Sequence, residues 1–204
     1  MLVASALECV RGDRTLFAGV SVTLAAGASL LVQGANGAGK TSLLRILVGL
    51  APPAHGEVAW NGQPIASLGD AYRRELAYCG HANALKDDLS AVENVRAAAT
   101  LAGRRIAREE ALAVLEGVGV ETAADLPVRS LSQGQKRRTS LARLALARAR
   151  LWVLDEPLAA LDAGGVEWLA ATLDAHLESG GLAVVTSHQP LPARAPFATL
   201  RIGA

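Results

Sequence analysis

The sequence predicts an α/β fold with a mostly parallel core sheet and an inserted helical subdomain. Short apolar runs alternate with stretches of helical periodicity, as expected for β–α–β units. A glycine-rich segment lies between a predicted strand and a predicted helix, and a later apolar run ends in two acidic residues. The 204 residues, 51% of them hydrophobic, suffice for one sizeable core. We therefore expect a single domain over residues 1–204, with a core at about 1–80 and 130–204 and the helical subdomain at about 85–130.

The first third of the chain is expected to supply four strands and one helix. Apolar residues recur at helical spacing from Lys40 to Leu50, and Pro52-Pro53 is expected to end that helix. The dipeptide Asn61-Gly62 indicates a tight turn. The strands are expected at residues 2–10, 20–24, 29–32 and 57–60.

The middle of the chain is rich in Ala, Arg and Glu, and its apolar residues are spaced as in helices from Ala91 to about Val118. This stretch is the predicted insert. The core is then expected to resume with helices at about residues 133–149 and 165–177 and strands at 151–154 and 182–185.

The segment Gly34-Ala-Asn-Gly-Ala-Gly-Lys40-Thr41 matches the pattern G-x-x-x-x-G-K-[ST] between a strand and a helix. Small residues let backbone N–H groups point toward phosphate oxygens, and the helix adds its positive end. Lys40 is expected to reach the β- and γ-phosphates, and Thr41 is expected to offer its hydroxyl to Mg²⁺. The alternative is a plain glycine-rich turn. The predicted nucleotide-binding residues here are Gly34, Ala35, Asn36, Gly37, Ala38, Gly39, Lys40, Thr41 and Ser42.

The apolar run Leu151–Leu154 is followed by Asp155 and Glu156. Asp155 is placed to hold Mg²⁺ through water, and Glu156 can polarise an attacking water. Taken alone, the pair is equally well explained as surface carboxylates at a strand end. Together with the phosphate-binding loop, it predicts nucleotide hydrolysis.

The segment Leu131-Ser-Gln-Gly-Gln135 precedes a long helix with many arginines. Ser132 can cap that helix, and Gly134 allows close approach to a ligand. On these residues alone, the preferred interpretation is a simple N-cap followed by a solvated basic face of Lys136, Arg137 and Arg138.

The same segment resembles the signature of ABC ATPases, usually written LSGGQ, with Gln133 in place of the first glycine. Ala160-Leu-Asp162 resembles the D-loop, and Thr186-Ser-His188 resembles the switch histidine that contacts the γ-phosphate. The motifs follow in the order of that family, and the resemblance covers about Leu7 to His188. It implies the ABC ATPase form of the P-loop NTPase fold, with an N-terminal antiparallel β part, ATP and Mg²⁺ as ligands, and catalytic roles for Glu156 and His188.

The resemblance also implies a homodimer. In the family, the signature of one subunit closes over the ATP held by the P-loop of the other. This chain has one copy of each motif, so a second copy would complete each site. Ser132, Gln133, Gly134 and Gln135 are then expected to face the partner's ATP.

Two positions depart from the family pattern. His81 stands where a glutamine usually touches Mg²⁺, and imidazole is a poor Mg²⁺ ligand because that ion prefers oxygen. Arg11 stands where an aromatic residue usually stacks on adenine. A guanidinium can also stack on a base, and Phe17 is close in sequence.

Within the family, the chain is most similar to heme exporter ATP-binding subunits of bacterial cytochrome c maturation. The segment from Gly80-His81 to Glu93-Asn94 carries this resemblance, as do Val128–Arg138 and the ending Thr186–Gln189. It implies a peripheral location on the cytoplasmic face of the inner membrane, integral membrane permease subunits, and heme that is handled by those partners. Cys79-Gly-His81 is not a C-x-x-C-H motif, so we expect no heme ligand in this chain.

Charge and cysteine content restrict the remaining alternatives. The formal net charge is +1, which gives no electrostatic reason to expect nucleic-acid binding. The two cysteines, Cys9 and Cys79, lie in apolar stretches and suggest no disulfide. An exporter ATPase for another cargo is still a possible function, because in transporters of the family that this chain resembles the ATPase subunit does not contact the cargo. A soluble ABC-type ATPase of nucleic-acid maintenance is disfavoured, since a long coiled-coil insert or a basic groove is missing.

Overall fold

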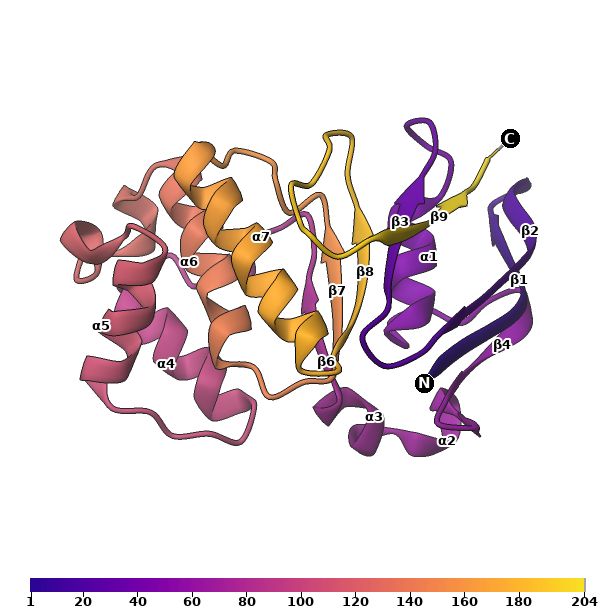
Figure 1. Cartoon of the computed structure of the whole chain (residues 1–204), viewed down its shortest axis with the longest axis horizontal. Helices are drawn as coiled ribbons and strands as arrows, with labels where there is room; N and C mark the ends of the chain where they lie inside the picture. Colours follow the sequence, from indigo (N-terminus) through magenta and orange to yellow (C-terminus); the bar gives the residue numbers. More distant parts are fainter. Residues whose placement is uncertain (204) are drawn as a thin grey trace.

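A computed structural model describes residues 1–203, and its strands form two sheets (Figure 1). A four-stranded antiparallel sheet has the order β2-β1-β4-β5. A five-stranded sheet has the order β6-β7-β8-β3-β9, and all its neighbouring strands run parallel. The predicted α/β class with a parallel core and an antiparallel part is therefore confirmed. The strands are β1 (Leu2–Arg11), β2 (Arg14–Leu24), β3 (Ser29–Gln33), β4 (His55–Trp60), β5 (Gln63–Pro64), β6 (Leu76–Cys79), β7 (Leu151–Asp155), β8 (Leu182–Thr186) and β9 (Phe197–Arg201).

The central strands of the parallel sheet are buried on both faces, which explains their continuous apolar runs. Successive residues of β7 alternate between two clusters. Leu151 and Val153 pack in a core with α1 and the antiparallel sheet, whereas Trp152 and Leu154 pack in a core with α6 and α7. The helices are α1 (Lys40–Leu47), α2 (Ile65–Leu68), α3 (Asp70–Arg74), α4 (Ala91–Leu101), α5 (Arg108–Gly117), α6 (Gln133–Leu146) and α7 (Ala163–Glu178).

The inserted stretch forms α4 and α5, which lie with α6 at one end of the molecule (Figure 1). Ser90 caps α4 in a capping box with Glu93, which explains why the helix begins there. Val92, Val95 and Leu115 are almost completely buried in a third apolar cluster. That cluster also includes Leu131 and Ala142, so the helix after the signature packs against the insert as well as against the sheet.

Several predicted boundaries were wrong. Helix α1 ends at Leu47, not Leu50, because Gly49 adopts a positive φ of 73° before the two prolines are reached. Helix α6 ends at Leu146 rather than Ala149. The predicted strand at 20–24 begins at Arg14, and the strand β9 was missed. The turn at Asn61-Gly62 is confirmed, since both residues have positive φ values between β4 and β5.

Candidate nucleotide-binding and hydrolysis site

The carboxyl ends of β3, β7 and β8 lie at the same edge of the parallel sheet, where α/β proteins bind ligands. The glycine-rich loop follows β3, the two acids end β7, and Thr186-Ser-His188 ends β8. Asp155 pairs in register with Thr186. The fold therefore brings together three of the motifs predicted from the sequence.

The glycines of the loop are required by the backbone that they adopt. Gly37 and Gly39 have φ values of 81° and 100°, in a region that a side chain disfavours. A Cβ atom on Gly34 would lie 2.5 Å from the Ile202 carbonyl oxygen, so this position also excludes a side chain. The loop is thus shaped by its own glycines and by the chain that follows β9.

Lys40 begins α1, and its Nζ atom donates hydrogen bonds to the carbonyl oxygens of Gly34 (2.8 Å) and Ala35 (3.2 Å). The ammonium group therefore lies across the loop whose N–H groups would bind phosphate. Ala38 is buried, whereas Asn36 and Gly37 are exposed and Ser42 is half-buried on the first turn of α1. The segment has the shape and charge that a nucleotide phosphate chain needs.

Asp155 is buried, and two hydroxyl groups donate to its carboxylate. Thr41 Oγ1 donates to Oδ2 (2.8 Å) and Thr186 Oγ1 donates to Oδ1 (2.7 Å). No Lys, Arg or His of residues 1–203 forms an ion pair with Asp155. A buried carboxylate without a cation is costly, and a hydroxyl beside a carboxylate is an oxygen donor set that Mg²⁺ prefers. Thr41 and Asp155 therefore fit the proposed Mg²⁺ site.

Glu156 has an unusual backbone conformation and a partly free carboxylate. Its φ is 47°, in the left-handed region that non-glycine residues seldom adopt. Its Oε2 atom accepts a hydrogen bond from the His188 backbone N–H (3.3 Å), and His188 Nε2 lies 3.5 Å from Oε1. Oε1 is buried and has no hydrogen-bond partner within the described chain. An acceptor with a free position is what a general base for water requires.

The signature segment begins α6, as predicted. Ser132 caps the helix by accepting from the Gln135 N–H (3.2 Å), and the Gln135 side chain accepts from the Ser132 N–H (2.9 Å). Gly134 lies against the carbonyl oxygen of Ala160, which is 3.1 Å from the position of a Cβ atom. The capping role expected for Ser132 is confirmed, and Gln133 occupies the exposed first turn.

The remaining predicted residues lie at the ends of strands and helices. Asp162 caps α7 and is 3.4 Å from Arg138 Nη1 of α6, which links the D-loop to the signature helix. His81 is exposed after β6, and within residues 1–203 its ring makes no hydrogen bond. Arg11 is exposed at the β1–β2 hairpin. Phe17, in contrast, is buried, and its ring lies 3.0 Å from the position of a Cβ atom on Gly39.

Sequence reasoning missed two residues of the site. Thr186 was noted only as a neighbour of His188, yet its hydroxyl bonds both Asp155 and the Glu156 N–H (2.8 Å). Arg137 was assigned to a solvated basic face, but its side chain is buried and donates to the carbonyls of Asp155 and Glu156. A threonine ending an apolar strand was the available signal for the first. The sequence offers no comparable signal for the second.

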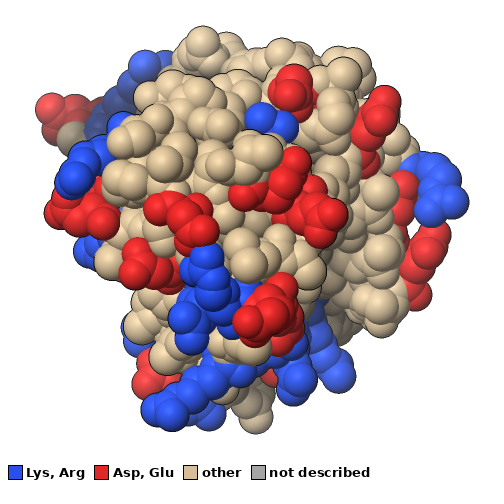
Figure 2. All heavy atoms as spheres, turned by 90° about the vertical axis from the view of Figure 1, so that its left-hand side faces the viewer, with Lys and Arg blue, Asp and Glu red and all other residues tan. Residues whose placement is uncertain are grey.

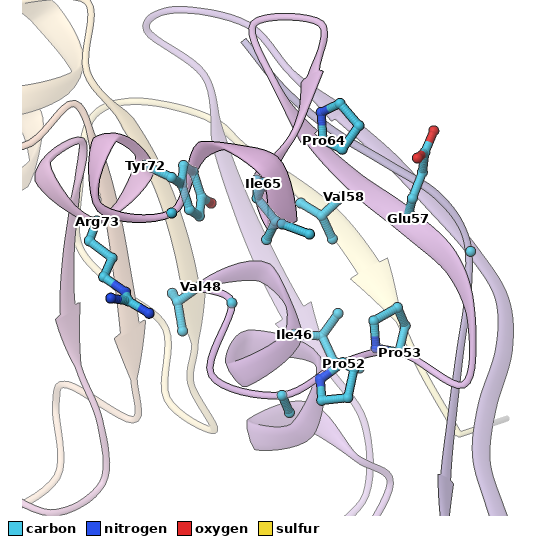
Figure 3. Close-up of a pocket in the computed structure, with 15 residues that line it drawn as sticks. Ile46, Val48, Pro52, Pro53, Glu57, Val58, Pro64, Ile65, Tyr72 and Arg73 are labelled. Carbon is cyan, nitrogen blue, oxygen red and sulfur yellow. The ribbon is translucent and has the colours of Figure 1, made fainter.

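Two cavities lie away from this edge of the sheet. Figure 3 shows the smaller one, of about 460 Å³, at the carboxyl end of α1, where Ile46, Val48, Pro52 and Ile65 line it. Tyr72 lies there too, and burial raises the pKa of its hydroxyl, which donates to the Leu47 carbonyl oxygen (2.6 Å). The larger one is a groove of about 830 Å³ between β6, α3, α4 and α6.

Comparisons with known proteins agree with this arrangement. The family model described as ABC transporter matches residues 17–159. The cytochrome c biogenesis ATP-binding export protein of Dechloromonas aromatica is 50% identical over 98% of both chains, and that of Pseudomonas aeruginosa is 48% identical over the full length of both. An ABC transporter ATP-binding protein from Pyrococcus furiosus has a similar structure, with a TM-score of 0.84, 25% identity, and coverage of 98% of this chain and 96% of that one. A dimeric ATP-binding cassette bound to ADP and Pi shares the fold, with a TM-score of 0.86, 23% identity and coverage of 100% and 94%.

Proposed function

The chain belongs to the ABC transporter family as an ATP-binding, ATP-hydrolysing subunit, and from this premise we propose that it works in c-type cytochrome biogenesis. It would couple hydrolysis to heme export or to release of a heme-loaded chaperone. The observation that supports this role is the identity of about 50%, over nearly the whole chain, to relatives named for cytochrome c biogenesis export.

The proposed hydrolysis reaction uses the groups at the sheet edge. The loop N–H groups and Lys40 would bind the phosphates of ATP, while Thr41 and Asp155 would hold Mg²⁺. The cation supplies charge neutralisation at the phosphates. Glu156 would accept a proton from the water whose oxygen bonds to the γ-phosphorus, as the bond from that phosphorus to the leaving oxygen of ADP breaks. His188, whose Nε2 atom is 3.5 Å from Glu156, would contact the γ-phosphate.

A homodimer would complete each site. Ser132, Gln133, Gly134 and Gln135 lie at the exposed or half-buried start of α6, where a second copy could bring its ATP against them. Glu156→Gln keeps the shape of the side chain but removes the proton acceptor. We expect this variant to bind ATP and to elute as a dimer in gel filtration with ATP and Mg²⁺. Monomer under those conditions would contradict the shared sites.

The groove beside α4 and α6 is the proposed docking site for an integral membrane permease subunit. Four arginines line it, with one acidic residue, Asp70. Leu101 also lines the groove, and this apolar side chain is 90% exposed to solvent. The occupant is therefore expected to be an acidic cytoplasmic segment of the permease with an apolar contact residue. The four arginines are Arg73, Arg74, Arg143 and Arg148.

The helical end of the molecule carries both acidic and basic side chains, which fits a protein partner better than nucleic acid. Figure 2 shows acidic side chains over the middle of this face and basic ones mostly in its lower part. Ion pairs such as Arg108–Asp125 and Arg129–Asp88 neutralise part of that charge. Within residues 1–203 no helix has the length and apolar character needed to cross a bilayer. We propose that the permease holds this subunit peripherally at the cytoplasmic face of the inner membrane.

The test of the cargo uses a bacterial strain that lacks the native protein. Expression of the Glu156→Gln variant should leave c-type cytochromes immature, with heme held covalently on the periplasmic chaperone. Staining membrane proteins for covalent heme measures both, and the wild-type chain is the control. Normal cytochrome levels with the variant would contradict the heme role and favour an exporter of another cargo, while leaving ATP hydrolysis in place.

A further inference from the structure

Arg137 carries a buried charge that no acidic side chain neutralises. Its relative exposure is 3%, and within residues 1–203 it forms no ion pair. A guanidinium buried without a carboxylate is costly unless every donor finds an acceptor. Its position on the second turn of α6 therefore calls for an explanation beyond packing.

Four backbone carbonyls and one side-chain amide oxygen, from two segments of the site, accept hydrogen bonds from Arg137. Nη2 donates to the carbonyl oxygens of Asp155 (3.0 Å) and Glu156 (2.8 Å), and Nε donates to that of Pro157 (3.4 Å). Nη1 donates to the Gly80 carbonyl oxygen (3.0 Å) and to Asn83 Oδ1 (3.4 Å). One planar group thus joins the end of β7 to the loop that contains His81.

These contacts explain how Glu156 keeps its strained backbone. A non-glycine residue with φ of 47° persists only where its surroundings hold it. The Glu156 N–H donates to Thr186 Oγ1 (2.8 Å), and its carbonyl accepts from Arg137. The N–H is therefore held by β8, and the carbonyl is held by Arg137 of α6 together with the Ala159 N–H (3.2 Å) of the following turn. The direction of the Glu156 carboxylate depends on this backbone.

We propose that Arg137 is a positioning residue for Glu156. It holds the strand end in the conformation that points the carboxylate toward the attacking water, and it does not itself touch ATP. Because Arg137 and the signature share α6, a movement of that helix would also move Glu156. This inference rests on the catalytic role proposed for Glu156 and does not depend on the cargo.

Two substitutions at Arg137 test the proposal. Arg137→Gln removes both the positive charge and the planar guanidinium with its several donors. Arg137→Lys keeps the charge but loses the guanidinium geometry, so its kcat can be measured even if the glutamine variant fails to fold. We expect kcat for ATP hydrolysis to fall about 10- to 100-fold, as for a catalytic group displaced by about 1 Å. The Kd for ATP, measured by calorimetry, should change less than about threefold, since the P-loop is untouched.

Control variants separate positioning from loss of stability or charge. Arg129→Gln removes an exposed arginine paired with Asp88 and should leave kcat unchanged. Leu173→Ala removes a fully buried side chain of α7 and should lower the thermal midpoint without lowering the kcat of the folded protein. If Leu173→Ala lowers kcat as much as Arg137→Lys does, the proposal is overturned.

A double-mutant cycle with Glu156→Gln decides whether Arg137 acts through Glu156. In that background, Arg137→Lys should leave the residual single-turnover rate unchanged, because the group that it positions is already inactive. If Arg137→Lys lowers the single-turnover rate of Glu156→Gln by the same factor as it lowers the wild-type rate, Arg137 does not act through Glu156 and the proposal is overturned. Wild-type turnover in Glu156→Gln alone would instead refute the role of Glu156, so the two failures are distinguishable.

Discussion

Thr186→Val is expected to destabilise the fold and to slow hydrolysis, although the two side chains are almost the same size. Thr186 is completely buried, and its hydroxyl donates to Asp155 Oδ1 (2.7 Å) while accepting from the Glu156 N–H (2.8 Å). Valine fills the space but does neither. The substitution therefore leaves a buried carboxylate oxygen and a backbone N–H of the site without their partner.

The magnitude follows from these two losses. A hydrogen bond to a charged group contributes about 1.5–3 kcal/mol, and a buried donor left unsatisfied costs about 1–3 kcal/mol. Asp155 keeps its bond from Thr41 and can relax, so we expect the free energy of unfolding to fall by about 2–5 kcal/mol. Turnover should fall by at least about tenfold, because the Glu156 backbone N–H loses its hydrogen-bond partner.

Urea denaturation and steady-state ATPase assays measure the two effects. Thr172→Val is the matched control, since its hydroxyl donates only to the Trp168 carbonyl oxygen within α7 (2.7 Å) and lies away from the sheet edge. That variant should change the free energy of unfolding by less than about 1 kcal/mol. If Thr186→Val were as stable as Thr172→Val, the stabilising role inferred for the Thr186 hydrogen bonds to Asp155 and Glu156 would be refuted.

Three further predictions concern Lys40, His81 and His176. Lys40→Ala should weaken ATP binding in calorimetry at least about tenfold, because a charge-assisted contact to phosphate is lost, whereas Lys86→Ala should not. His81→Gln should keep most ATPase activity, whereas His81→Ala should weaken coupling to the permease more than it weakens ATP binding. If both variants have equal, negligible effects on ATPase activity and on cytochrome maturation, His81 is an ordinary loop residue. Burial lowers the pKa of His176, which stacks on Trp152. As the pH falls, the unfolded chain therefore protonates His176 before the folded chain does. The free energy of unfolding should then decrease as pH falls below about 6.5, down to the folded pKa. In urea titrations between about pH 7.5 and 5, His176→Phe should show less of this decrease, and the same pH dependence as the wild type would contradict the prediction.

The sequence was sufficient to predict the parts of the site that follow from local pattern. The loop at 34–41 and the acids at 155–156 could be placed at one sheet edge because each follows a strand, and parallel strands share that edge. Ser132 could be assigned as a cap from its place before a periodic helix, and the structure confirms it.

The parts that could not be predicted depend on distant partners. Arg137 lies beside two other basic residues, a pattern typical of an exposed face, yet the Gly80 carbonyl that accepts from it is 57 positions away in the chain. Strand β9 was missed because its pattern of half-buried and exposed residues is weak for a sheet neighbour of β3. Helix α1 ended early because a glycine, not the prolines, set its last turn.

The position of β3 in the sheet has a consequence for synthesis of the chain. Both of its neighbours, β8 and β9, follow it by about 150 residues or more, so the strand that leads into the phosphate loop stays unpaired until nearly all of these residues have been made. At ribosomal rates of about 5–20 residues per second, that interval is on the order of ten seconds. A nascent chain should therefore be unable to bind ATP until β8 and β9 emerge, and nucleotide binding would be among its last properties to appear.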